Sequence, residues 1–222
     1  MDTRTSFRNA VQDAQAFNTD KVDRRPGFIS SVGRMGKSQK RDVRALPAID
    51  NARRGPVADV ARLMAEGTTS AVEQVRNALE VINRLQPELN AFAHLAPEAE
   101  LMELAESLDR ERAAGKIRSP LHGLPISVKD VVHVKGMPTS SGSKVMEGFM
   151  PDDDATAVRL LREAGAIIIG KAHTHEFALG VTTPQSRNPW DTSRDPGGSS
   201  GGSAISVSTG MSFLSVGTDT RA

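Results

Sequence analysis

The spacing of apolar residues predicts two helices at the start of the ordered part of the chain. Apolar side chains recur at helical intervals over 57–64, and we expect Gly67 to end this first helix. Ser70 and Glu73 match a capping box, in which each side chain accepts a hydrogen bond from the backbone N–H of the other residue. The helix that follows has an apolar face, and we expect Pro87 to end it.

Further along the chain, helical and strand-like patterns alternate. The expected elements are a short strand at 89–95, a helix from Pro97 to Gly115, a strand at 125–134, a helix at 154–164, a strand at 166–169 and, after a Gly/Ser loop at 197–203, a short helix and a strand at 212–216. The strands on either side of the 154–164 helix are apolar runs, as in strands buried on both faces. This order predicts a βαβ unit with parallel strands, so the fold class is α/β.

Residues 1–55 differ from the rest of the chain in charge and in pattern. They contain 12 lysines and arginines against six aspartates, and they lack sustained periodicity. We interpret this segment as a disordered basic extension before an ordered domain at 56–222. A start codon placed too far upstream and a basic partner-binding arm are the alternatives, whereas the aspartates argue against a transit peptide.

The overall composition excludes several classes of protein. The net charge is only +1, so no general attraction to nucleic acid or to an anionic membrane follows. The absence of cysteine excludes disulfides, thiolate catalysis and cysteine metal sites. No apolar run approaches the roughly 20 residues of a membrane-spanning helix, and the first residues lack the apolar core of a secretory signal. We expect a cytoplasmic protein without nucleic-acid or membrane partners.

Two segments match ligand-binding motifs only superficially. Residues 165–172 nearly fit a phosphate-binding loop, but the last position is alanine and three central isoleucines favour a strand. His173 and His175 could place two imidazoles on one side of a strand, but a helical zinc motif needs its second histidine where Leu179 stands. We therefore expect no nucleotide and no metal site, and we interpret His133 as a core or rim histidine.

The strongest chemical signal is the Gly/Ser segment at 196–204, which contains four glycines and three serines. A flexible linker is the usual interpretation of such a sequence, but apolar sequence suited to a helix and a strand follows at once. Glycines beside the start of a helix allow the backbone to approach a ligand closely. Lys129, isolated in an apolar strand, is the second signal, because burial would lower its pKa and make a neutral amine available as a base.

These segments resemble the amidase-signature family, and they occur in the family's order. The matching segments are 123–130, 135–143, 154–158, 163–171, 175–180, 187–191, 196–204 and 217–220. The resemblance covers about residues 56–220. It implies the amino-terminal part of the family's fold, a mixed central sheet flanked by helices.

The resemblance also implies a Ser–cis-Ser–Lys mechanism for the hydrolysis of a carboxylic amide. By this resemblance Lys129 is the base, and Ser199, preceded by a cis peptide, passes the proton between the lysine and a nucleophilic serine. An acyl-enzyme forms, and ammonia or an amine leaves. The expected partner is a small amide substrate, with no metal and no organic cofactor, and a homo-oligomer stays open.

The sequence departs from the family pattern at its end. After Gly-Thr-Asp-Thr at 217–220 the family continues with two glycines and the nucleophile, whereas this chain has Arg221 and Ala222. We therefore expect the nucleophile one position beyond residue 222, with Thr220 as the remaining oxyanion-hole residue of that loop. The loop at 183–187 is also shorter than in relatives, which affects substrate specificity.

Three functional interpretations follow from these observations. The first is a stand-alone amidase, which the segment 174–177 favours. Residues 1–222 alone would not complete the amidase reaction, because the nucleophile is expected beyond them. The second is the amidase subunit of a tRNA-dependent amidotransferase. The third is a non-catalytic remnant or partner-binding fragment. Sequencing the DNA beyond codon 222 would distinguish a broken amidase gene from the others.

Overall fold

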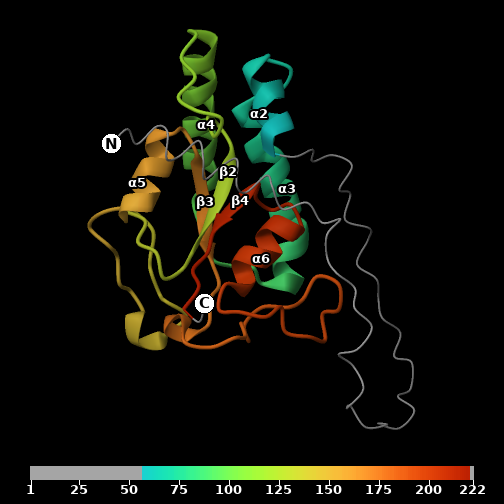
Figure 1. The fold of residues 1–222 in the computed structure, drawn as a ribbon, viewed down its shortest axis with the longest axis vertical. Helices are drawn as coiled ribbons and strands as arrows, with labels where there is room; N and C mark the ends of the chain where they lie inside the picture. The colour runs from blue at the N-terminus through green and yellow to red at the C-terminus, as the bar shows by residue number, and fades with distance from the viewer. Residues whose placement is uncertain (1–56, 221–222) are drawn as a thin grey trace, which may run out of the picture. The chain divides into compact units, whose positions relative to one another are not determined.

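A computed structural model describes residues 57–220, so the prediction of a disordered extension at 1–55 lies outside the described residues. The elements are α2 (Val57–Ala65), α3 (Ala71–Leu89), β1 (Phe92–Leu95), α4 (Glu98–Ala113), β2 (Pro125–Lys129), η3 (Lys144–Met146), α5 (Thr156–Glu163), β3 (Ile167–Ala172), η4 (Glu176–Ala178), α6 (Gly201–Ser208) and β4 (Leu214–Val216). Figure 1 shows the strands at the centre with α5 and α6 on opposite sides of them.

The four strands form one mixed sheet in the order β1-β3-β2-β4. β2 pairs in parallel with both β3 and β4, while β1 runs antiparallel to β3. The crossover from β2 to β3 contains α5, so the predicted βαβ unit and the α/β class are confirmed. β2 therefore lies between two other strands and carries its last residue, Lys129, to the carboxyl end of the parallel part of the sheet.

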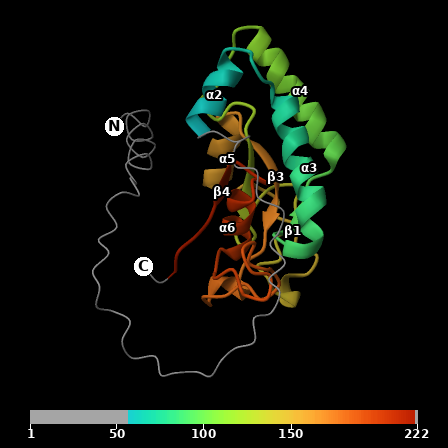
Figure 2. The same cartoon turned by 90° about the vertical axis from the view of Figure 1, so that its right-hand side faces the viewer.

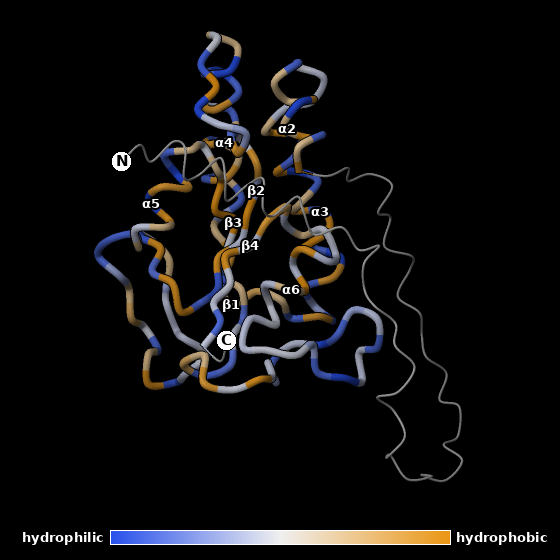
Figure 3. Tube along the Cα trace, in the orientation of Figure 1, coloured by the Kyte–Doolittle hydropathy of each residue, from blue (hydrophilic) through white to orange (hydrophobic). Residues whose placement is uncertain are grey.

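Apolar side chains cover the sheet in two clusters, one on each face. The larger cluster joins α2, α3 and α4 to Ile167 and Ile169 of β3 and to Ile205 of α6. The smaller cluster joins Val158 of α5 to Ile168 of β3 and to the inner residues of β2. Figure 2 shows α3 and α4 side by side along one flank of the strands, and Figure 3 shows hydrophobic and hydrophilic colours alternating along the helices.

A β-bulge interrupts the pairing of β2 and β3. Ile126 lies opposite Ile168, but Ser127 lies opposite Gly170, so Ile169 is an extra residue in β3. Beyond the bulge Lys171 pairs with Val128 and shares the face of that residue. Strict alternation from Ile169 would instead have placed Lys171 on the face of the larger apolar cluster.

The prediction that Pro87 ends the second helix is wrong. α3 continues through Pro87 and ends at Leu89. Its C-cap residue, Asn90, has a left-handed backbone (φ 48°), and the Asn90 N–H donates to Gln86 O at 2.9 Å. Pro87 lies in the last turn, where the loss of one backbone donor removes a single hydrogen bond without stopping the helix. The strand expected from residue 89 accordingly starts at Phe92.

The strand predicted at 125–134 is also shorter than expected. β2 ends at Lys129, and the chain turns there, with Val132 N–H donating to Lys129 O at 3.0 Å. Val134 still packs in the smaller apolar cluster. The run of β-branched residues therefore predicts a buried strand correctly only for its first half, because Val131 and Val132 are half-buried.

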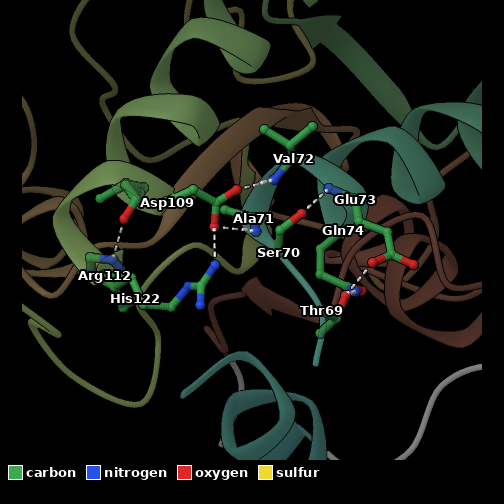
Figure 4. A network of polar contacts seen from close by, with 10 residues as sticks. Thr69, Ser70, Ala71, Val72, Glu73, Gln74, Asp109, Arg112 and His122 are labelled. Carbon is green, nitrogen blue, oxygen red and sulfur yellow. Dashed lines mark hydrogen bonds and ion pairs between the residues drawn. The ribbon is translucent and has the colours of Figure 1, made fainter. Parts of the chain in front are cut away.

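The start of α3 is held by a residue from another helix. Ser70 Oγ accepts from Glu73 N at 3.1 Å as predicted, but the Glu73 carboxylate accepts from Thr69 Oγ1 at 2.7 Å, so the second half of the expected capping box is not formed. Asp109 of α4 accepts from Ala71 N at 2.9 Å and from Val72 N at 3.1 Å, as Figure 4 shows. These bonds satisfy helix-terminal N–H groups and fix α3 to α4.

Within the described residues, none of the helices combines the length and the apolarity that crossing a membrane would require.

Replacing Asp109 by alanine should lower the free energy of unfolding by about 1–2 kcal/mol, because two helix-terminal N–H groups lose their acceptor. Urea denaturation followed by circular dichroism measures this change. Glu103→Ala, at an exposed position of the same helix, is the matched control and should change stability by less than about 0.5 kcal/mol. Equal effects of the two substitutions would contradict the capping role.

Candidate active site

Lys129 lies at the end of β2 with its amine directed away from solvent. The residue is fully buried, and its Nζ lies 2.6 Å from Ser199 Oγ and 2.7 Å from Thr218 Oγ1. The predicted contact between Lys129 and Ser199 is therefore confirmed. Both distances are those of direct hydrogen bonds, so a proton can pass between amine and hydroxyl without a bridging water.

The Gly/Ser segment places Ser199 by close backbone packing. The peptide bond between Gly198 and Ser199 is cis, and α6 begins two residues later. A side chain on Gly198 would collide with the backbone of Thr182, and one on Gly202 would collide with the backbone of His173. The glycines therefore act as packing positions, which the linker interpretation does not explain.

Buried serines hold α6 against the strand that carries Lys129. Ser127, two residues before Lys129 and on the same face of β2, lies 2.8 Å from Ser206 Oγ in α6 and donates to Ser215 Oγ of β4 at 2.7 Å. Its hydroxyl also lies 3.2 Å from Ser212 Oγ. This cluster fixes the helix that follows Ser199 relative to β2, and so supports the contact described above.

Burial lowers the pKa of the Lys129 amine, because a charged ammonium loses its hydration inside the protein. The negative charge of Asp219 acts in the opposite direction and favours the ammonium. The direction expected from an isolated lysine in an apolar strand is thus confirmed. A neutral amine at this position can accept a proton from Ser199.

A pocket with a volume of about 360 Å³ opens beside Ser199. It is lined by Gly180, Val181, Pro196, Gly198, Ser199, Ser200, Gly201, Ala204, Thr218, Asp219 and Thr220. Thr220, predicted for the oxyanion hole, therefore lies at the pocket, where its hydroxyl donates to Ala178 O at 2.9 Å. A small substrate in the pocket would contact Ser199, which lines it, and not Lys129, which lies behind Ser199.

Thr218 was not among the residues singled out from the sequence. Its hydroxyl is the second oxygen on Lys129 Nζ, and its backbone joins the Gly/Ser segment through hydrogen bonds with Ser200 Oγ, at 3.1 Å from the carbonyl and 3.3 Å from the N–H. The signal was present, because Thr218 belongs to the 217–220 motif. The motif pattern alone, however, does not show which of its side chains reaches the lysine.

The structure shows where the segment 165–172 and the histidines lie that the sequence analysis rejected as nucleotide and metal sites. The strand expected in place of a phosphate loop is β3, which runs through Ile167–Ala172. His173 is partly buried and burial lowers its pKa, whereas His133 is exposed at the rim with its ring 5.5 Å from Phe149. Among residues 57–220, no three histidine or carboxylate side chains gather in a group that could hold a metal ion.

Comparison with known proteins agrees with this geometry. A model of the family described as Amidase matches residues 73–221 of the chain. The chain belongs to the amidase family. Among solved amidase structures, it is similar to the native peptide amidase from Stenotrophomonas maltophilia, with 35% sequence identity and a TM-score of 0.68 over 75% of this chain and 36% of that one.

Curated relatives with higher identity carry a different description, that of a glutamyl-tRNA(Gln) amidotransferase subunit. The relative from Rhodopirellula baltica is 46% identical over 167 residues, and the relative from Maridesulfovibrio salexigens is 48% identical over 166 residues. These matches cover 73% and 72% of this chain and 33% of each relative. The chain thus spans about a third of the length of the amidase-family relatives that it matches.

We predict that replacing Asp219 by asparagine lowers the pKa of Lys129 further, because it removes the negative charge that favours the ammonium. Carbon chemical shifts of ¹³C-labelled lysine side chains, followed against pH, measure this pKa. Asp219→Glu keeps the charge and is the control, which should change the pKa less. An upward shift in the asparagine variant would contradict the assigned role of Asp219.

Proposed function

We propose that this chain carries the proton-transfer residues of an amidase that hydrolyses a carboxylic amide through an acyl-enzyme. The contact of 2.6 Å between Lys129 Nζ and Ser199 Oγ, beside a pocket, is the observation that supports the proposal most directly. Membership of the amidase family supports hydrolysis of a C–N bond. Lowering of the Lys129 pKa by burial supports its use as a base.

In the proposed mechanism Lys129 and Ser199 act as one proton relay. Neutral Lys129 accepts the proton of Ser199 Oγ–H while Ser199 accepts the proton of a nucleophilic serine, which attacks the amide carbonyl. The relay returns a proton to the leaving nitrogen, so ammonia or an amine departs and an acyl-enzyme remains. Water, activated by the same relay, then releases the carboxylic acid.

The proposed mechanism also needs a nucleophile and an oxyanion hole, which the family pattern places in and after the segment 217–220. The family pattern places the nucleophile after two glycines that follow Thr220, and Arg221 and Ala222 stand in place of these glycines. Backbone N–H groups of that loop would stabilise the oxyanion, and Thr220 is our candidate for one of them. We therefore propose that residues 1–222 alone do not release ammonia, because they lack the nucleophile.

A second candidate function is that of the amidase subunit of a tRNA-dependent amidotransferase. Relatives at 46% and 48% identity, which are described as amidotransferase subunits, favour it. The relay chemistry would be the same, but the protein would act together with partner subunits. Dependence on partners is the property that separates the two candidates.

The relay can be tested by grafting residues 57–220 into the matching part of the Stenotrophomonas maltophilia peptide amidase. We expect ammonia release from primary amides by the graft and none by residues 1–222 alone. In the graft, Lys129→Met or Ser199→Ala should lower kcat by about 10²–10⁴-fold, because proton transfer is lost. Lys144→Met, at an exposed lysine, is the control and should leave kcat unchanged.

Turnover by residues 1–222 that equals turnover by the graft would overturn the proposal, because the nucleophile would then lie within these residues. Full activity of the Lys129→Met graft would overturn the role of the lysine. Intact folding of each variant is established by circular dichroism before the assay.

A reciprocal graft into the Rhodopirellula baltica amidotransferase subunit separates the two candidate functions. Both candidates share the relay, so the two grafts are compared by the fraction of the host's own activity that each retains. If residues 57–220 retain more activity in the amidotransferase subunit with its partner subunits, the second candidate is supported. If they retain more in the stand-alone amidase, the first candidate is supported.

A further inference from the structure

A second buried lysine lies directly behind the proposed relay. Lys171 Nζ in β3 lies 2.9 Å from Asp130 Oδ1, and the two side chains are 0% and 1% exposed. Asp130 follows Lys129 directly, and its contact with Lys171 places its carboxylate on the face of Val128, opposite to the face of the Lys129 side chain. The bulge in β3 turns Lys171 to the face that Asp130 shares with Val128.

This ion pair is an unusual choice for stability alone. Removing both charges from water carries a large desolvation penalty, and well-packed apolar residues of similar volume often stabilise a protein as well or better. Apolar residues already surround the site, since Ile126, Val128 and Ile168 on the same face belong to the smaller cluster. The hydrogen bonds of Asp130 and Lys171, which apolar residues could not make, are therefore the evidence for what the pair does.

The remaining side-chain hydrogen bonds of the pair reach one segment, residues 138–140. Lys171 Nζ donates to Thr139 Oγ1 at 2.8 Å and to Pro138 O at 3.1 Å. Asp130 Oδ2 accepts from Ser140 N at 3.1 Å and from the Ser140 hydroxyl. Backbone bonding continues the attachment, because Ser141 N–H donates to Asp130 O at 3.1 Å.

From this segment the contacts continue to the far side of the proposed relay. Ser141 O accepts from Phe177 N at 2.8 Å, and Ser143 Oγ donates to Glu176 Oε1 at 2.6 Å. The 175–178 segment in turn contacts the relay and the pocket. His175 N–H donates to Ser199 O at 3.0 Å, and Ala178 O accepts from the pocket residue Thr220.

We propose that Asp130 and Lys171 are positioning residues that hold Ser199 against Lys129 through the segments 138–143 and 175–178. The catalytic meaning of that contact rests on the proposed function, but the positioning itself does not. The pair contributes no net charge beside Lys129. The other titratable groups near the relay and the pair are Asp219 beyond β4, His173, His175 and Glu176 after β3, and His94 in β1, while α6 carries none.

The test is the double substitution Asp130→Leu with Lys171→Met. It replaces an ion pair, whose net charge is zero, by two uncharged side chains of similar length. A change in the pKa of Lys129 then reports a change in geometry and hydration and not in local net charge. If the proposal is correct, the released segments admit water to the relay and the pKa of Lys129 rises toward that of an ordinary lysine. We expect a rise of about one pKa unit in the ¹³C-lysine titration of the 222-residue chain.

Two further variants show whether the effect is specific. Thr139→Val with Ser140→Ala keeps the ion pair but removes its two hydrogen bonds with the hydroxyls of Thr139 and Ser140, and should raise the pKa of Lys129 in the same direction. Asp109→Ala weakens α3 at the other end of the fold, so it should lower stability and leave the pKa of Lys129 unchanged. Urea denaturation of each variant shows that it is folded under the titration conditions.

An unchanged pKa of Lys129 in the folded Asp130→Leu, Lys171→Met variant overturns the proposal, and so does an equal rise in Asp109→Ala. If the double variant does not fold, the Thr139→Val, Ser140→Ala protein decides, and an unchanged pKa there overturns the proposal. The titration needs no substrate and no nucleophile. Absence of amide hydrolysis in the graft would therefore refute the proposed function without affecting this result.

Discussion

Burial of two lysine amines in one four-stranded sheet is the constraint on which the site depends. Burial lowers the pKa of both Lys129 and Lys171, since each ammonium loses its hydration. The surroundings differ, because Lys171 lies against the Asp130 carboxylate whereas Lys129 lies against the hydroxyls of Ser199 and Thr218. A carboxylate partner favours the charged amine, but hydroxyl partners can exchange protons with a neutral one. The two buried lysines of the sheet thus differ in their neighbours, a carboxylate for Lys171 and two hydroxyls for Lys129.

Features with a local signal could be predicted from the sequence. Alternating helix and strand patterns indicated the α/β class, and an isolated lysine in an apolar strand pointed to Lys129. The role of Lys171 could not be predicted in this way, because a one-residue bulge reverses the face of every residue beyond it. The capping role of Asp109 could not be predicted either, because Asp109 lies 38 residues from the N–H group of Ala71 that it caps. Pro87 misled because the same residue that breaks a helix interior is tolerated near the end of a helix.

The Gly/Ser segment illustrates how composition and structure can point in opposite directions. Its glycines give an unfolded chain large conformational freedom, and fixing that freedom opposes folding. Here Gly198 and Gly202 lie where a side chain would collide with backbone from other segments. Close packing compensates for the entropy that glycine loses, and it brings Ser199 to a lysine 70 residues away in sequence. The segment is therefore ordered by its tertiary contacts and not by its own preferences.

Rigidity of β2 links the two faces of the sheet. The strand pairs with β3 on one edge and with β4 on the other, so its last residues cannot shift without breaking bonds on both sides. Lys129 lies on the face of β2 where Ser127 contacts Ser206 of α6, whereas Asp130 contacts the segment at 138–140. Contacts on both faces therefore hold the same peptide unit, the one between these two residues. For this reason the supports on the Asp130 face can matter for the reactivity of an amine on the opposite face, although no side chain crosses the sheet.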